Sequence, residues 1–217
     1  MKQIKFSICT ASLCLLMSCV DLDLNPLSEG SSENWYSSQA EIEMSLNDFY
    51  RTDFFPIDDM KWGDDVTARN ETSAVNNGTF TSEDGTIAKR WENYYKGIAR
   101  ALRIINNMDR ARAMGVSEKD IAQYEGEAYF YLGYAYGMLA FHWGDAILDK
   151  VGMSLDEAYT ASRSPKADVL AYSYECLDKA AERLPNSYPG IQRATKGATY
   201  AFKARIAIYN EDYATAA

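Results

Sequence analysis

A run of seventeen uncharged residues in the middle of the chain, AYFYLGYAYGMLAFHWG, constrains the fold more than any other feature. It lies between Glu127 and Asp145, and the pattern Ser117-x-x-Asp120 ahead of it predicts the start of a helix spanning about 118 to 143. The run is shorter than the roughly 20 residues that cross a bilayer, tyrosines fill its middle, and charges stand directly outside it. We therefore predict a core helix rather than a membrane span.

Gly133 and Gly137 stand four residues apart in this run. Small residues at that spacing let a neighbouring helix approach closely. We expect the neighbour to be another core helix of the same chain, and dimerisation within a membrane is the alternative.

Four further segments have apolar residues at helical spacing and predict the helices that pack on this one. They span about 37 to 50, about 87 to Gly115, about 165 to 184 and about 193 to 209. The last runs into Glu211–Ala217, which resembles the turn and second-helix start of a tetratricopeptide repeat, a unit of paired helices. Because that second helix stops after one turn, we expect a fragment truncated at its C-terminus. The prediction is an all-α, tetratricopeptide-like helical scaffold with long loops.

The first residues predict export and a lipid anchor. Two lysines precede an apolar run, Ile8–Met17, that is too short to span a bilayer, and Leu16-Met17-Ser18-Cys19 resembles the lipobox at which bacteria acylate a cysteine. Stable anchoring takes at least two acyl chains, which such a cysteine would carry. We expect residues 1–18 to be a lipoprotein signal peptide, 19–36 a lipidated tether and 37–217 the helical domain. An ordinary signal peptide with incidental cysteines is the alternative.

Composition and single residues argue against several kinds of chemistry. The net charge is −9, and removal of the signal takes two more lysines and no acid, so nucleic acid is not an expected partner. Cys176 would remain as the sole unmodified thiol and His142 is the sole histidine, so neither a metal site nor a Ser-His-Asp or Cys-His set can be assembled. We expect no cofactor, no metal and no enzymatic activity. The adjacent acids Asp58-Asp59 and Asp64-Asp65 leave glycoside hydrolysis as a minor alternative.

The long irregular stretch from 51 to 86 holds the residue types that bind sugars: an aromatic face for the C–H groups of the ring, and charged or amide side chains for its hydroxyls. Within it, Asn77-Gly78 between Val75 and Phe80 is a hairpin-turn signal. The alternative is that its tryptophan fills the core while the other residues are only solvated. The predicted ligand-binding residues are Trp62, Asp64, Asp65, Arg69, Asn76 and Asn77.

Trp91 and the basic residues of the second helical segment are predicted to have structural roles and not to bind a ligand. Trp91 lies on the apolar stripe of the second helical segment, which predicts packing. Lys96, Arg100, Arg103 and Arg110 lie on another face of that segment, which predicts a solvated surface.

Several motifs occur together along the chain: Cys19 followed by DLDLNP, Trp91-x-x-Tyr94-Tyr95-x-Gly97-Ile98, Gly126-Glu127-Ala128, Trp143-Gly144-Asp145 and ATYAFKARIAIYNEDYATAA. In this order they resemble the SusD/RagB family of nutrient-binding outer-membrane lipoproteins of the Bacteroides group. Two positions depart from the family pattern: Tyr129 stands where arginine is usual, and Ala146-Ile147 where valine and proline are usual.

The resemblance implies the N-terminal part of a SusD-like fold, at less than half the usual length. It also implies a lipoprotein on the outer face of the outer membrane that binds an oligosaccharide or another nutrient and delivers it, chemically unchanged, to a TonB-dependent (SusC-like) transporter. A tetratricopeptide-like scaffold that binds proteins and no glycan is the alternative.

Overall fold

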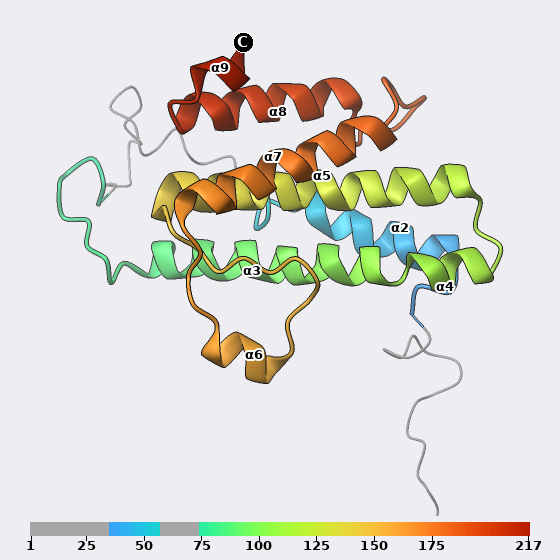
Figure 1. Ribbon diagram of the computed structural model, residues 1–217, viewed down its shortest axis with the longest axis horizontal. Coiled ribbons are helices and arrows are strands. Elements are labelled where there is room, and N and C mark those ends of the chain that lie inside the picture. Colours follow the sequence, from blue (N-terminus) through green and yellow to red (C-terminus); the bar gives the residue numbers. More distant parts are fainter. Residues whose placement is uncertain (1–34, 57–73) are drawn as a thin grey trace, which may run out of the picture. The chain divides into compact units, whose positions relative to one another are not determined.

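The computed structural model of the protein describes residues 35–56 and 74–217 (Figure 1). Within these ranges the regular elements are helices, so the all-α prediction is confirmed. No helix of this part of the chain combines the length and apolarity needed to cross a membrane. Outside the described residues lie the predicted anchor Cys19, the predicted ligand residues Trp62, Asp64, Asp65 and Arg69, and the adjacent acids Asp58 and Asp59.

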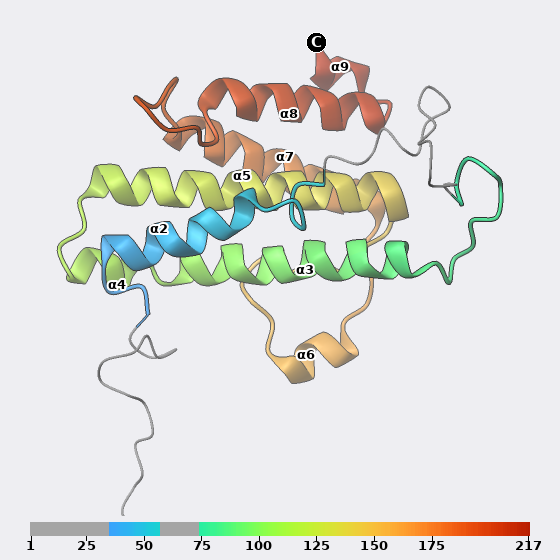
Figure 2. The same ribbon diagram turned by 180° about the vertical axis from the view of Figure 1, so that it is seen from behind.

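Helix α5, Glu118–Trp143, lies at the centre of the fold and is buried along most of its length. It packs on α3, Gly85–Asn106, along one side and on α7, Lys166–Arg183, along the other (Figure 1). Helix α2, Gln39–Asn47, lies across α3 and α5, as Figure 2 shows. The uncharged run is thus surrounded by other helices, as predicted for a core helix.

Two of the three glycines of α5, Gly133 and Gly137, mark close approaches to neighbouring helices. A Cβ added at Gly133 would lie 2.5 Å from Cγ of Leu177 in α7, and one at Gly137 would lie 2.6 Å from Cδ1 of Ile206 in α8, Lys196–Tyr209. Ser173 of α7 donates a hydrogen bond of 2.6 Å to the backbone oxygen of Gly133. The predicted close approach of core helices is confirmed.

The segment from about 87 to Gly115 is two helices rather than the single helix predicted. Helix α3 ends at Asn106, and α4, Met108–Ala113, follows after Asn107. The Asn107 side chain donates a hydrogen bond of 2.7 Å to the backbone oxygen of Arg103, which competes with the regular helical pattern. Gly115, with φ of +89°, then ends α4 as predicted.

The C-terminal helices follow the predicted order. Pro165 precedes α7, Thr195 caps α8 by accepting a hydrogen bond from the backbone N–H of Ala198, and α9, Tyr213–Ala216, turns back beside α8 (Figure 1). Stacked antiparallel helices of this kind are the arrangement of tetratricopeptide-like repeats. Near the N-terminus, α2 is followed by a 3₁₀ turn, η1, Asp48–Tyr50, where one helix to residue 50 was predicted.

A buried ion pair between Arg193 and Glu127 joins the segment before α8 to the core. The Glu127 side chain, 1% exposed, accepts hydrogen bonds from Nη1 of Arg193 at 2.8 Å and from the Tyr50 hydroxyl at 2.9 Å. Nη2 of Arg193 also donates to Oδ1 of Asn47 at 2.5 Å, and the backbone N–H of Ala194 donates to the Tyr50 hydroxyl at 2.9 Å. The pair therefore joins α2, η1, α5 and the entry to α8.

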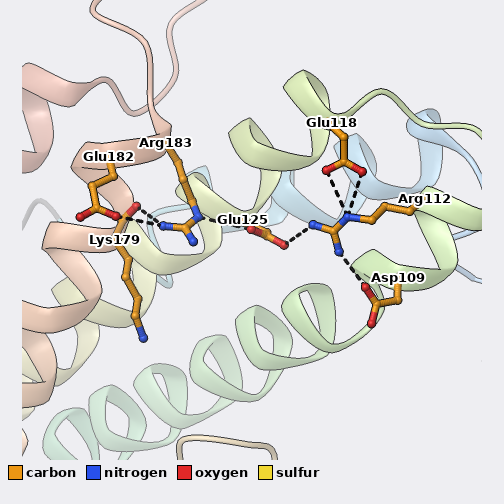
Figure 3. Close-up of polar contacts among 7 residues, drawn as sticks. All are labelled: Asp109, Arg112, Glu118, Glu125, Lys179, Glu182 and Arg183. Carbon is orange, nitrogen blue, oxygen red and sulfur yellow. Dashed lines mark hydrogen bonds and ion pairs between the residues drawn. The ribbon is translucent and has the colours of Figure 1, made fainter.

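A second set of charges joins α4, α5 and α7 at the surface (Figure 3). Glu125 of α5 accepts hydrogen bonds from Arg112 of α4 at 3.1 Å and from Arg183 of α7 at 3.3 Å. Tyr129, where the resembling family usually has arginine, lies beneath Lys179 and Arg183, with its ring centroid 5.2 and 5.3 Å from their charged groups. An aromatic ring thus occupies this position against two cations of α7.

An arm between α5 and α7 carries a helix that the sequence analysis did not predict. Its base is closed by an antiparallel bridge between Ala146 and Ser164, and its tip is α6, Leu155–Thr160, which extends beyond α3 (Figures 1 and 2). Ser154 and Glu157 form a capping box at the start of α6. No residue of α6 is buried, so the helix lacks the apolar stripe by which the other helices were found.

Candidate functional site

A cavity of about 390 Å³ opens beside the first turns of α3. Its walls come from two segments, the loop that follows η1 and the N-terminal half of α3. We call it the α3 cavity, and its lining residues are Thr52, Asp53, Pro56, Gly85, Thr86, Lys89, Arg90 and Asn93.

One wall is a single face of α3. Asp84 caps the helix, because its carboxylate accepts a hydrogen bond of 2.8 Å from the backbone N–H of Thr86. From that start, Thr86, Lys89, Arg90 and Asn93 follow the spacing of neighbours on one helix face, and all four line the cavity. Arg90 is only 9% exposed, whereas its neighbour Lys89 is exposed.

The other wall is a turn held in place by aromatic packing. The backbone N–H groups of Phe54 and Phe55 both donate to the backbone oxygen of Arg51 at 3.0 Å. The two phenylalanine rings pack against Tyr131 of α5, with centroids 5.8 and 5.4 Å from its ring. Because these rings anchor the turn in the core, Thr52 on the same turn is held at the cavity.

The charged residues that line the α3 cavity are two cations, Lys89 and Arg90, and one acid, Asp53. Helix α3 contains five basic residues, Lys89, Arg90, Lys96, Arg100 and Arg103, against the single acid Glu92. Glu92 binds both Lys96 and Lys89, and these hydrogen bonds lower the pKa of its carboxyl group. The predicted solvent exposure of Lys96, Arg100, Arg103 and Arg110 is confirmed, although Arg100 also pairs with Asp48 and lies over the Phe54 ring.

Aromatic rings gather on a different face of the same turns of α3. Trp91 contacts Trp143 of α5 edge to face, with centroids 5.3 Å apart, and the guanidinium of Arg163 lies 5.0 Å from the Trp91 ring. Tyr95 donates a hydrogen bond of 2.9 Å to the backbone oxygen of Ile147, and burial raises the pKa of Tyr95 to about 12. Trp91 is half-buried in this packing, which confirms the role predicted for it.

The two residues considered for nucleophilic or metal chemistry, Cys176 and His142, are packed against other side chains of the fold. Cys176 is a buried free thiol, and burial raises its pKa to about 12, so it is not a thiolate at neutral pH. His142 lies between the rings of Phe141 and Trp143 at the end of α5, as predicted for a helix-terminal histidine. In residues 35–56 and 74–217 there is no group of three side chains suited to hold a metal ion.

The predicted ligand residues that the structure describes are Asn76 and Asn77, and both are exposed in the loop before α3. Asn77 accepts hydrogen bonds from the backbone N–H and the hydroxyl of Thr79, at 3.1 and 2.6 Å. Gly78 adopts φ of +73°, and its N–H donates to the backbone oxygen of Val75 at 3.3 Å. The turn was predicted correctly but the hairpin was wrong, because no strands flank the turn in the described part of this loop.

Asn76 and Asn77 do not line the α3 cavity. Conversely, the sequence analysis did not single out Lys89, Arg90 or Asn93. Their spacing on one face, directly after a loop already considered for ligand binding, is the signal that could have identified them.

Comparison with known proteins places this arrangement in a family. Residues 30–208 match the SusD-like family described as starch-binding and associating with the outer membrane. A SusD-like protein P2 of Formosa agariphila is 23% identical over 225 residues, which is 94% of this chain and 43% of that protein.

Two solved structures show the same fold. A SusD superfamily protein from Bacteroides vulgatus superposes with a TM-score of 0.70 at 22% identity, over 84% of this chain and 42% of that one. A SusD-like carbohydrate-binding protein from Bacteroides fragilis gives 0.67 at 19% identity, over 85% and 40%. The chain thus spans about two fifths of the length of these relatives. From the match that covers most of its residues, the chain belongs to the SusD-like family.

Proposed function

We propose that this protein binds a glycan at the cell surface and delivers it to a TonB-dependent transporter of the outer membrane. The observation that carries the proposal is the α3 cavity, whose lining includes an amide, two hydroxyls and two cations, in a chain whose family is described as starch-binding. The glycan leaves chemically unchanged, so the protein acts as a binding protein and not as an enzyme.

The side chains of the cavity suit sugar hydroxyl groups. Thr52 and Thr86 each offer a hydroxyl that donates and accepts, Asn93 offers an amide, and Arg90 offers several N–H donors. Pockets for small ligands typically have volumes of about 300 to 1,000 Å³. Because each hydrogen bond at a solvated site contributes only about 1 kcal/mol net, we expect modest affinity for a single sugar unit.

The loop before α3 supplies the second part of the proposed site. We propose that it adds contacts along a longer chain of sugar units, with Trp62 as the aromatic platform. The residues proposed for this role remain Trp62, Asp64, Asp65, Arg69, Asn76 and Asn77.

Retention on immobilised glycans and peptides tests this proposal against the protein-binding alternative. We expect the purified protein to be retained by at least one glycan, and the substitutions Asn93→Ala and Trp62→Ala each to weaken that retention. Lys119→Ala, an exposed change at the opposite end of α5 from the cavity, is the matched control and should have no effect. Retention by peptides alone would favour the scaffold function instead, and shortened glycan products would reveal an enzyme.

The arm around α6 supports a protein partner. Val151, Leu155 and Tyr159 are 73%, 70% and 81% exposed, so the arm presents three apolar side chains to solvent. Leu155 and Tyr159 stand four residues apart, the spacing of anchors that insert into a groove of a partner. We propose that this surface contacts the transporter.

Hydrogen bonds of Asp149 and Tyr136 hold the backbone of the arm at residues 149 to 153, although α6 at its tip has no buried residue. The Asp149 carboxylate accepts hydrogen bonds from the backbone N–H groups of Val151, Gly152 and Met153 at 3.0, 2.7 and 2.8 Å. The Tyr136 hydroxyl donates to the backbone oxygen of Asp149 at 2.7 Å. Such preorganisation lowers the entropy lost when a surface binds its partner.

Purification of the tagged protein from membranes of the organism that produces it tests whether a transporter binds to it. We expect mass spectrometry to identify a TonB-dependent transporter, and Leu155→Ser with Tyr159→Ser to reduce its recovery without altering glycan retention. Met114→Ser, which changes a 62% exposed side chain in the turn before α5, is the control. Unchanged recovery with the arm variant would contradict the contact proposed for α6.

The proposed anchor is a lipidated Cys19 exposed after removal of residues 1–18, with residues 19–36 as the tether and 37–217 as the SusD-like N-terminal helical domain. We expect labelled palmitate to be incorporated into the protein but not into a Cys19→Ala variant. Protease added to intact cells should degrade the anchored protein if it faces the exterior. Resistance to protease in intact cells and sensitivity in lysed cells would place it on the inner side.

A further inference from the structure

Among the residues that the structure describes, three acidic groups at or beside the α3 cavity are engaged by other parts of the protein. Asp53 pairs with Arg51 at 2.9 Å, and the Asp84 carboxylate caps α3 through the backbone N–H of Thr86. Glu92, the single acid of α3, is shared between Lys89 at 3.2 Å and Lys96. Two ammonium groups therefore share one carboxylate on the helix that forms a cavity wall.

The cations beside the cavity stand out against the composition of the chain. The whole sequence carries 31 acidic and 22 basic residues, yet the charged residues that line the cavity are two cations, Lys89 and Arg90, and one acid, Asp53. Lys89 and Arg90 are adjacent in sequence and both lie on the cavity wall formed by α3. A cavity wall of this kind, in an otherwise acidic protein, attracts an anion rather than a cation.

We infer that the α3 cavity selects a glycan bearing an acidic group, a uronic acid or a sulfated sugar, over a neutral one. This inference rests on the proposed glycan binding and names its substrate class. Thr52, Thr86 and Asn93 bind hydroxyl groups of the sugar, which both classes share. Lys89 and Arg90 bind the carboxylate or sulfate, because charge-assisted hydrogen bonds from these cations are about twice as strong as neutral ones.

Titration calorimetry with matched glycans tests this inference. The probes are oligogalacturonates, their methyl esters, sulfated galactan oligomers, the same oligomers without sulfate, and malto-oligosaccharides. We expect an acidic oligomer to bind about fivefold more tightly than its neutral counterpart, because one charge-assisted hydrogen bond is about twice as strong as a neutral one. Raising the salt concentration should weaken the acidic ligand and leave the neutral one unchanged.

Two substitutions locate the preference. Lys89→Gln changes an exposed side chain and should remove most of the preference, while Lys89→Arg should keep it. Lys119→Gln, an exposed lysine on the first turn of α5, is the control and should keep the full preference. Arg90 is buried, so its replacement can also destabilise the fold. Binding by Arg90→Gln is therefore compared only after an unfolding curve has shown that the variant is folded.

Three outcomes separate the possibilities. Equal or tighter binding of the neutral oligomers overturns the inference and leaves glycan binding in place. An acidic preference that survives Lys89→Gln overturns the assignment to the α3 cavity. Absence of binding to every oligomer in the panel contradicts the proposed function together with the inference.

Discussion

Substitution of Arg193 by methionine should destabilise the protein more than any other loss of a charged side chain discussed above. Arg193 is 11% exposed and its partner Glu127 is 1% exposed, so the change leaves a carboxylate in the core without its cation. Removing one partner of a buried pair typically costs about 3 to 5 kcal/mol. The Tyr50 hydroxyl and the Gln123 amide still donate to Glu127, so we expect a loss near about 3 kcal/mol, at the lower end of that range.

Urea unfolding followed by circular dichroism and by tryptophan fluorescence measures this loss. For a domain of this size, about 3 kcal/mol lowers the midpoint of thermal unfolding by about 6 to 12 °C. Arg51→Met is the matched control, because Arg51 also pairs with two acids but its side chain is 59% exposed, and it should leave the midpoint nearly unchanged.

The double variant Glu127→Gln, Arg193→Met separates the stranded charge from lost packing. If the buried carboxylate is the cause, neutralising it should recover at least about 1 kcal/mol of the loss, a coupling typical of residues in contact. Equal destabilisation by Arg193→Met and Arg51→Met, or no recovery in the double variant, would refute the reasoning.

Three further predictions concern packing, reactivity and pH. Gly133→Ala should destabilise the protein by about 1 to 3 kcal/mol, because the added Cβ would clash with Leu177 and with the backbone oxygen of Ser173. Gly197→Ala, which adds a Cβ in open space on α8, should instead stabilise the protein by up to about 1 kcal/mol. Urea unfolding measures both changes. Peptide mass spectrometry after thiol labelling at neutral pH should find Cys176 unmodified in the folded protein and modified after unfolding, since burial raises its pKa to about 12. The free energy of unfolding should fall as the pH rises from about 10 towards 12, because Tyr95 has a pKa of about 12 in the folded protein and near 10 in the unfolded chain. Circular dichroism and tyrosinate absorbance, measured against pH, should therefore show unfolding and tyrosine ionisation together. Ionisation of every tyrosine near pH 10 without unfolding would contradict this prediction.

Elements with a local signal were predictable from the sequence. The uncharged run of α5 has no polar face, so only burial on all sides could accommodate it, and Gly133 and Gly137 marked where α7 and α8 approach. Pro165 likewise indicated the start of α7. In each case the residues that decide the structure are neighbours in sequence or carry a single strong constraint.

Elements that depend on weak or competing local bonds were missed. Helix α6 buries no residue, so only the pair Ser154 and Glu157 signals it, and such a pair has little weight without an apolar stripe. The break at Asn107 depends on one side chain bonding to the Arg103 carbonyl, which apolar spacing does not reveal.

The site was harder to predict than the fold because it is built from distant segments. The α3 cavity exists only because Phe54 and Phe55 anchor one turn against Tyr131 of α5, which brings Thr52 beside Arg90 of α3. The stretch from 51 to 86, which the sequence analysis considered for ligand binding, contributes Thr52, Asp53, Pro56, Gly85 and Thr86 to the lining of this cavity. Lys89 and Arg90 were not selected, since basic residues on a helix are usually solvated.

Hydrogen–deuterium exchange with and without a bound glycan tests most directly whether the α3 cavity captures sugars. We expect slower exchange in peptides covering residues 51–93 when glycan is added, with little change in α7 or α8, and loss of that protection in the Asn93→Ala variant. Protection confined to other parts of the chain, or protection that Asn93→Ala leaves intact, would contradict it.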